Sequence, residues 1–381
     1  MIRFELMAIL LASLLFAVLS VSFSGTTHRT ATPFSSITVT TATSSIAVPS
    51  LVGLPSLTLE EPVATTTPPA KSRAPTMPAH HAVVATPAPA PVPIPVLTIP
   101  LLVAQSALDA SASALRGALV NILCSAPAGS RIHSISASGI MVGAQGYILT
   151  NAHVAQYFLL ADQGVSCAIR TGDPATTAYR AKLAFIPAPW VRDNATVLTQ
   201  AAPSGTGERD FAILAITGSA TKAPLPIFFP TVPLSFSVPA SGTPVVIASY
   251  GAQFLQSSEI QTALSPTIVF GSVVKLFTFG TNTADVLSLG GSAAAQEGSS
   301  GGGVADALGE LVGDITTSTI EGDTSTRTLS AITASYIRRE YTAETGETLE
   351  LLFTRSPAVA VATFAPTVPG LEAILLDVLA H

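Results

Sequence analysis

Residues 137–154 read ASGIMVGAQGYILTNAHV, and this stretch decides the fold. Two short apolar runs, SGIMV and GYILT, are separated by a glycine-bounded turn, and His153 follows the second run. Similar short apolar segments, separated by Gly, Pro, Ser and Asn, recur from Ser106 to about Thr354. Short strands at regular spacing, with few helical repeats, are typical of all-β sandwiches and barrels. We predict an all-β domain with one short helix after His153 and another near residues 334–341.

Two further motifs carry candidate chemistry. In GERDFAILAI, Asp210 is followed at once by an apolar strand, and in QEGSSGGGV, Ser300 lies in a run of glycines. Glycines in a tight turn expose a hydroxyl while backbone N–H groups converge beside it. Serine is a poor nucleophile unless a base accepts its proton and a third group orients that base. The motifs therefore predict Ser300 as the nucleophile, His153 as the base and Asp210 as the orienting carboxylate, with an oxyanion hole formed by the N–H groups of Gly298 and Ser300.

Each motif has an ordinary structural explanation when it is taken alone. A Ser-Gly loop is usually a flexible turn, a histidine after a strand is often structural, and an aspartate before a strand is commonly a cap. The case for chemistry rests on co-occurrence, because the region from Ser106 to Thr354 contains two histidines, His133 and His153, and one lies in such a motif. The order His, Asp, Ser is also that of one known triad arrangement.

At these residues the chain resembles the trypsin-like (chymotrypsin-fold) serine peptidases, and among them the bacterial HtrA-like branch. The resemblance covers most of residues 118–333. It rests on segments similar to that branch's first strand, histidine segment, aspartate strand, second-barrel opening and nucleophile hairpin: ALVNI, ASGIMVGAQGYILTNAHV, ERDFAILAI, VVIASYG and SAAAQEGSSGGGVADALGELVGDIT. The resemblance implies two six-stranded β-barrels with short helices and an active site in the cleft between them. It implies the same roles for His153, Asp210, Ser300 and Gly298.

The chain departs from the family pattern at two positions. Gly303 stands where the family usually has proline, and Ser292 stands where the HtrA-like branch often has aspartate. The second barrel needs most of the residues that follow Ser300, so we expect no PDZ domain.

The resemblance also implies a specificity pocket. Ala294 would lie at its base, and Ile315, Thr316 and Thr317 would form one wall. Without a carboxylate at the base the pocket should not favour Lys or Arg, and we expect a preference for small or medium apolar side chains. Asp314 is close in sequence, but the alternation of side chains along a strand would turn it away from the pocket.

Cys124 and Cys167 lie on either side of the histidine segment. In an exported protein an even number of cysteines suggests a disulfide, and the alternative is two buried thiols that pack as small apolar side chains. No cluster of residues has metal-ligand spacing, and no phosphate-cradling or dinucleotide motif follows a strand. We expect no metal and no cofactor.

The composition excludes some classes of function. The chain has 381 residues, of which 48% are hydrophobic and 10% charged, with a formal net charge of −6. An acidic balance supplies no basic face for phosphates, which argues against nucleic-acid binding. The mean hydropathy is high, at +0.54. However, residues 6–23 are the one long uncharged apolar run, at the lower limit for crossing a bilayer. A multi-pass membrane protein is therefore not expected.

We predict four regions along the chain. Residues 1–24 are a cleaved signal peptide or an uncleaved single-pass membrane anchor, and either would export the remainder to the cell envelope or the extracellular space. Residues 25–105 hold about half of the 29 prolines, with many Thr, Ser and Ala, which predicts a disordered, semi-rigid stalk. Residues 106–355 form the peptidase domain. Residues 356–381 form a C-terminal extension that ends in an amphipathic stretch.

The sequence thus predicts an exported serine endopeptidase that hydrolyses peptide bonds through an acyl-enzyme intermediate. Its partners would be protein or peptide substrates, with a membrane contacted through the N-terminal segment alone. Two alternatives stay open: a catalytically silent member of the same fold that acts as a binding module on a stalk, and a purely structural wall-spanning protein. The natural substrate and the oligomeric state do not follow from the sequence.

Overall fold

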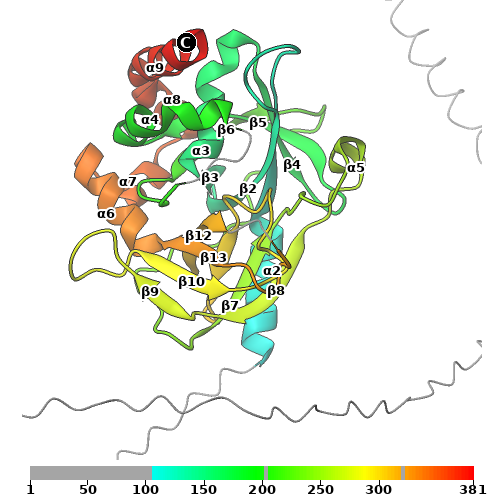
Figure 1. The fold of residues 1–381 in the computed structure, drawn as a ribbon, viewed down its shortest axis with the longest axis vertical. Coiled ribbons are helices and arrows are strands. Elements are labelled where there is room, and N and C mark those ends of the chain that lie inside the picture. Colours follow the sequence, from blue (N-terminus) through cyan, green and yellow to red (C-terminus); the bar gives the residue numbers. More distant parts are fainter. Residues whose placement is uncertain (1–104, 201–204, 319–321) are drawn as a thin grey trace, which may run out of the picture. The chain divides into compact units, whose positions relative to one another are not determined.

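The computed structural model describes residues 105–200, 205–318 and 322–381. The predicted signal peptide or anchor and the predicted stalk lie outside these residues, except for Gln105. Two β-structures adjoin one another in the described chain, and helices gather at the end that holds the C-terminus and along one side (Figure 1).

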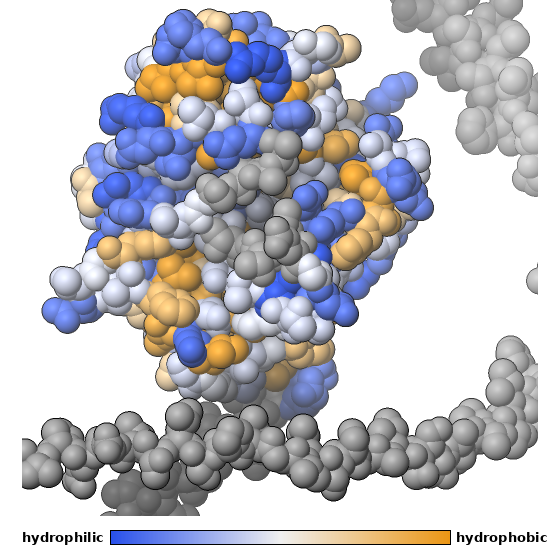
Figure 2. All heavy atoms as spheres, in the orientation of Figure 1, coloured by the Kyte–Doolittle hydropathy of each residue, from blue (hydrophilic) through white to orange (hydrophobic). Residues whose placement is uncertain are grey.

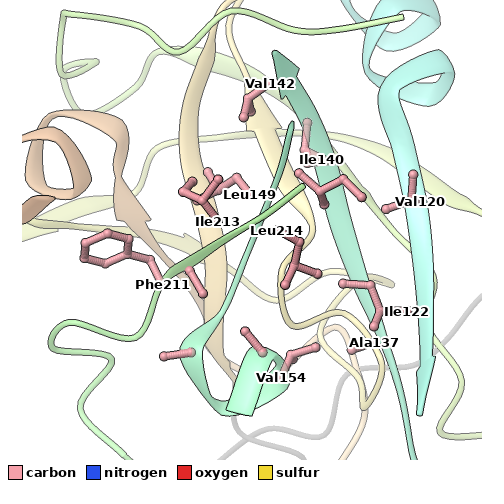
Figure 3. Close-up of a cluster of buried hydrophobic side chains, with 14 of the residues drawn as sticks. Val120, Ile122, Ala137, Ile140, Val142, Leu149, Val154, Phe211, Ile213 and Leu214 are labelled. Carbon is pink, nitrogen blue, oxygen red and sulfur yellow. The ribbon is translucent and has the colours of Figure 1, made fainter. Parts of the chain in front are cut away.

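Six antiparallel strands form the first β-structure, a closed barrel in the order β1-β2-β3-β6-β5-β4. The strands are β1 (Leu119–Ser125), β2 (Ile135–Gly143), β3 (Tyr147–Thr150), β4 (Ser166–Thr171), β5 (Thr176–Phe185) and β6 (Ala212–Ser219). Their apolar side chains, among them Ile122, Ile140 and Leu149, are buried together (Figure 3). Each such side chain contributes about 1.5–3 kcal/mol on burial. The apolar runs are therefore short because each one crosses a small barrel once.

A disulfide joins Cys124 to Cys167, which confirms the predicted bond. The two residues face each other in the register of β1 with β4. This pairing is the one that closes the barrel, because β1 and β4 stand at opposite ends of the strand order. The covalent link therefore reinforces the closure of the first barrel.

The second β-structure is an antiparallel sheet in the order β8-β7-β11-β12-β13-β10-β9. The strands are β7 (Pro244–Ser249), β8 (Thr267–Ser272), β9 (Lys275–Phe277), β10 (Val286–Gly290), β11 (Gly303–Ala305), β12 (Leu311–Ser318) and β13 (Leu329–Thr333). The two-barrel fold is confirmed, with seven strands in this half where six were predicted. The extra strand arises because one apolar run changes its partner strand at Val273 and Val274. The N–H of Val273 donates to the carbonyl oxygen of Thr243, next to β7, and the N–H of Val274 donates to that of Ser288 in β10. Since β8 and β9 are the two edges of the sheet, this run curls the sheet toward closure.

The two predicted helices are present. The first begins directly at the histidine segment, as α3 (Ala152–Ala155) and η1 (Gln156–Gln163), and the second is α6 (Ala334–Thr345). Thr333 caps α6 by accepting a hydrogen bond from the N–H of Tyr336. Shorter helices lie in the connections: α4 (Ala188–Asn194), η2 (Ala195–Thr199), α5 (Ser257–Thr262) and α7 (Leu349–Thr354).

Helix α2 (Gln105–Ala118) was not predicted. Its buried positions include Leu108, Ser111 and Leu115, which share one face because they are three or four residues apart. This face packs against β2 of the first barrel and against β7 and β11 of the second. The hydroxyl of Ser111 also donates to the carbonyl oxygen of Asp306. The helix therefore bridges the two β-structures.

Leu115 of α2 is one of three side chains that close off the space beside Gly303. A Cβ atom at Gly303 would lie 2.9 Å from side-chain atoms of both Leu115 and Ile140, and 2.7 Å from one of Leu311. These distances are shorter than real Cβ contacts. A side chain at 303 would therefore require the side chains of Leu115 in α2, Ile140 in β2 and Leu311 in β12 to shift.

The C-terminal extension is helical and packs on the first barrel. Helix α8 (Pro357–Phe364) contacts β5 and β6, and α9 (Val368–Ala380), which follows the short turn η3 (Ala365–Thr367), contacts η1, α4 and η2. Leu371 and Leu375 of α9 are buried in these contacts. Apolar side chains nevertheless gather on the surface at this end of the molecule (Figure 2). Within the described residues one helical stretch, Pro357–Ala380, is apolar and long enough to cross a membrane by those two criteria, with a mean hydropathy of 1.7 and 17% burial.

Candidate active site

His153 and Asp210 form a close pair on the first barrel. His153 lies where β3 passes into α3, and Asp210 lies just before β6, the strand that pairs with β3. The distance from His153 Nδ1 to Asp210 Oδ2 is 2.7 Å, and the backbone N–H of His153 donates to Asp210 Oδ1 at 2.9 Å. With an ionised carboxylate at Nδ1, the neutral imidazole carries its proton on that nitrogen. Nε2 is then left as the basic atom.

The surroundings of the pair differ in exposure. The side chain of His153 is 22% exposed and that of Asp210 is 9% exposed. The ring can therefore meet a solute, whereas the carboxylate is almost closed off behind it. A buried charge needs donors, and Thr316 of β12 supplies another, because its hydroxyl donates to Asp210 Oδ2 at 2.8 Å.

Asn151 and Asp314 lie behind this pair. The side-chain amide of Asn151 donates to the carbonyl oxygen of Asp210 and to Asp314 Oδ2, each at 3.0 Å. Both side chains belong to fully buried residues. Burial raises the pKa of Asp314 well above its usual range, and the negative charge of Asp210 raises it further. Asp314 is therefore linked to the Asp210 segment through the amide of Asn151.

The loop that carries Ser300 is held by Ser138 of β2. The backbone N–H of Ser138 donates to the carbonyl oxygen of Ser300, and its hydroxyl donates to that of Gly298, both at 2.8 Å. The same hydroxyl accepts a hydrogen bond from the N–H of Tyr250 at 2.8 Å. One serine of the first barrel therefore fixes both ends of the Gly298–Ser300 turn against the second.

Two glycines make this close approach possible. Gly298 and Gly301 have φ values of +91° and +81°, in the left-handed region that side chains disfavour. A Cβ atom at Gly301 would lie 2.1 Å from the carbonyl oxygen of Ser138 and 2.4 Å from Thr150 Oγ1. Thr150 is three residues before His153, so the Ser300 loop lies directly against the histidine segment.

The same loop is also joined to the strand that contacts Asp210. The N–H of Gly301 donates to the carbonyl oxygen of Ile315, and the N–H of Ile315 donates to Gly302, at 2.8 and 2.7 Å. Thr316, the next residue, is the one that reaches Asp210. His153, Asp210 and Ser300 are therefore brought to one seam between the two β-structures. Among the described residues, no hydrogen bond joins Ser300 Oγ to the ring of His153, and such contacts often tighten only when substrate binds.

The backbone around Ser300 presents unused donors. The N–H groups of Ser299 and Gly301 donate to Gln296 and Ile315. In the part of the chain that the structure describes, the N–H groups of Gly298 and Ser300 donate to no protein acceptor. Two free N–H groups on either side of a held turn can receive an oxygen atom that carries negative charge.

The residues predicted for the pocket have different surroundings. Ala294 is fully buried, and Ile315 is packed in the core of the second sheet. Thr316 donates to Asp210, as described above, and the side chain of Thr317 lies outside the described residues. Sequence reasoning missed Arg327, which is 5% exposed and donates from Nη1 to the carbonyl oxygen of Ala295 at 2.7 Å.

No cation site stands out near the seam. Within residues 105–200, 205–318 and 322–381, no group of three or more His, Cys, Asp or Glu side chains is placed to hold a metal ion.

One family model matches the central part of the chain. Residues 137–313 match the family model described as the trypsin-like peptidase domain. Among solved structures, the chain is similar to the active form of the Rv3671c protease from M. tuberculosis, with 19% identity, coverage of 62% of this chain and 85% of that chain, and a TM-score of 0.39. The chain is also similar to an inactive form of the same protease, with 18% identity, coverage of 62% of this chain and 93% of that chain, and a TM-score of 0.38. No curated protein sequence matches the chain significantly.

The close approach of Gly301 to Ser138 and Thr150 can be tested by a substitution that adds a Cβ atom at position 301. We expect Gly301→Ala to lower the free energy of unfolding by about 3 kcal/mol or more, because backbone strain and a clash with Ser138 and Thr150 add together. Gly129 is a matched control, since it has a φ of +77° and nothing lies within 4 Å of the position that a Cβ atom would take there. Gly129→Ala should cost about 1–2 kcal/mol from strain alone. Equal losses in urea unfolding of the two variants would contradict the close approach.

Proposed function

We propose, from the premise that residues 137–313 form a trypsin-like peptidase domain, that this chain hydrolyses peptide bonds with Ser300 as its nucleophile. The observation that carries the proposal is the Asp210 carboxylate, which accepts bonds from the ring and the backbone of His153. A carboxylate in this position selects the tautomer of His153 that can act as a base. Protein or peptide substrates follow from the family.

In the proposed mechanism Ser300 Oγ attacks the carbonyl carbon of the scissile bond. His153 Nε2 accepts the hydroxyl proton, and Asp210 stabilises the imidazolium that forms. The oxygen of the tetrahedral intermediate takes the negative charge and binds the N–H groups of Gly298 and Ser300. Each such donor is worth about 3–4 kcal/mol in comparable sites.

Collapse of the intermediate then releases the amine. His153 returns its proton to the leaving nitrogen, and the acyl group stays on Ser300 as an ester. A water molecule attacks this ester with His153 again accepting a proton, which frees the acid product and regenerates the hydroxyl. Thr316, through its bond to Asp210, keeps the carboxylate aligned during both halves.

We further propose that the domain acts outside the membrane. The apolar run at residues 6–23 would export the chain as a signal peptide or an anchor. The disulfide between Cys124 and Cys167 supports this, because such bonds persist in oxidising compartments. Residues 25–105 would then space the peptidase domain from the membrane as a stalk.

A membrane-impermeant reagent tests the proposed export. We expect an amine-reactive biotin probe added to intact cells to label the peptidase domain without lysis. A cytoplasmic protein in the same cells serves as the control and should be labelled after lysis only. Labelling of the domain that also requires lysis would contradict export.

The nucleophile is tested with a fluorophosphonate. We expect the folded wild-type chain to be labelled, and Ser300→Ala to lose labelling and at least about 10⁴-fold of its peptide hydrolysis, because no other group can form the acyl-enzyme. Ser299→Ala is the matched control, since its buried hydroxyl is already bonded to Ser249. A folded wild-type chain that resists the probe would favour the catalytically silent binding module.

The predicted pocket is tested with chromogenic peptides that differ at the residue before the scissile bond. The guanidinium of Arg327 next to Ala295 adds to the expectation that Lys and Arg are disfavoured, because like charges repel. We expect peptides with Ala or Val to be cleaved at least about tenfold more efficiently than the Arg peptide, a difference of about 1.4 kcal/mol. A strong preference for Arg would overturn this assignment of the pocket.

A further inference from the structure

We infer that Asp314 is a positioning residue for the proposed active site, and that it acts as an uncharged carboxylic acid which holds the Asp210 segment through Asn151. Its effect on activity rests on the proposed function, whereas its effect on stability does not. Asp314 and Thr316 are two residues apart on β12, and the side chains of both are joined by hydrogen bonds to the Asp210 segment. Thr316 bonds the carboxylate of Asp210 directly, and Asp314 reaches its backbone through one amide.

The contacts of Asp314 do not suit a charged group. The residue is fully buried, and the one hydrogen bond to its side chain comes from the neutral amide of Asn151. Asp314 Oδ1 has no hydrogen-bond partner among the described residues, and neither has Asn151 Oδ1. An ionised carboxylate offers about four acceptor positions and needs donors or a cation when it is buried. A protonated carboxyl carries no charge, so its burial with few hydrogen bonds costs less.

The charges that face Asp314 come from one side. It pairs with Gly303 of β11 and Ile332 of β13, and neither strand carries a titratable residue. Helix α6 also packs against β12, and its charged side chains have partners elsewhere: Arg338 bonds Glu350, Arg339 bonds Asp285 and Glu340 bonds Arg209. The start of β6 and the β3–α3 junction bring Asp210 and His153. Burial raises the pKa of Asp314 well above its usual range and the negative charge of Asp210 raises it further, which favours the protonated form that the sparse contacts of Asp314 already indicate.

Asp285 shows what a buried charged aspartate needs in this same chain. Its side chain is also 0% exposed, yet it accepts bonds from Arg339, from the N–H of Phe279 and from the hydroxyls of Thr278 and Thr283. These donors hold its pKa below the usual range in spite of burial. We therefore expect substitution by asparagine to change the stability of the protein in opposite directions at these two aspartates.

The dependence of the protein's stability on pH follows from the direction of each pKa shift. Asp314 ionises at an ordinary pKa when the chain unfolds, so its raised pKa in the folded state makes the protein lose stability as pH rises above about 4. Asparagine keeps the shape and cannot ionise, so Asp314→Asn removes this loss. Asp285, with a lowered pKa, contributes stability above about pH 4 that is lost as pH falls.

The experiment measures Tm from pH 4 to pH 8.5 for the full chain and its variants. We expect Asp314→Asn to raise Tm over the wild type by about 4 °C or more at pH 8, with the gap closing near pH 4. Asp285→Asn should lower Tm at pH 8, with the gap shrinking at acid pH. An Asp314→Asn chain that does not fold, or that melts below the wild type at pH 8, overturns the inference.

Kinetic measurements on variants distinguish a positioning role of Asp314 from a purely structural one. We expect Asp314→Asn to retain kcat/KM within about threefold at pH 7 and to keep activity further into alkaline pH than the wild type, because its amide can still bond Asn151. Asp314→Leu, which fills the site without that bond, should lower kcat at least about tenfold while KM changes little. Equal kcat for the Leu and Asn variants would overturn the positioning role. If the wild type hydrolyses no peptide, the proposed function fails and the Tm series still decides the charge state of Asp314.

Discussion

The buried carboxylate of Asp210 is the constraint on which the site depends. Two of its hydrogen bonds come from His153 in the first barrel, and a third comes from Thr316 in the second sheet. Since these donors belong to different sheets, the charge is satisfied only where both are packed in one fixed arrangement. The seam is therefore set by polar contacts as well as by apolar burial.

The low content of charged residues agrees with the way in which buried polar groups are hydrogen-bonded, both at this seam and elsewhere in the described residues. Buried polar groups are hydrogen-bonded mostly to amides, hydroxyls and backbone carbonyls, and less often to a charged side chain. Arg170, whose side chain is enclosed, bonds the amide oxygen of Asn121 and the carbonyl oxygens of Ala175, Ile260 and Gln261. Ser138 serves two carbonyl oxygens of the Ser300 loop in the same way. A chain with 10% charged residues can thus satisfy its interior without many counter-ions.

Local sequence was enough to predict most strands and the three motif residues, because each apolar run ends at a glycine, a proline or a polar cluster. The catalytic roles of His153, Asp210 and Ser300 stay predictions, as do the pocket and the domain boundaries. The supporting contacts could not be predicted, since Ser138 and Gly298 are 160 residues apart and Thr316 and Asp210 are 106 apart. Helix α2 was missed because its Ala- and Ser-rich sequence has few large apolar residues to mark a buried face. The seventh strand of the second sheet depends on where Val273 and Val274 change their partner strand from β7 to β10, which no local pattern indicates.

The packing of α2 against Gly303 sets the size of the smallest folding unit. The helix precedes the first strand in the chain, yet its Leu115 fills the space beside the Ser300 loop. A fragment that starts at β1 would expose Ile140 and Leu311 in an apolar groove at the seam, with only glycine backbone between them. The autonomous unit of this chain therefore includes α2, whose buried residues begin at Leu108, eleven residues before the first barrel strand.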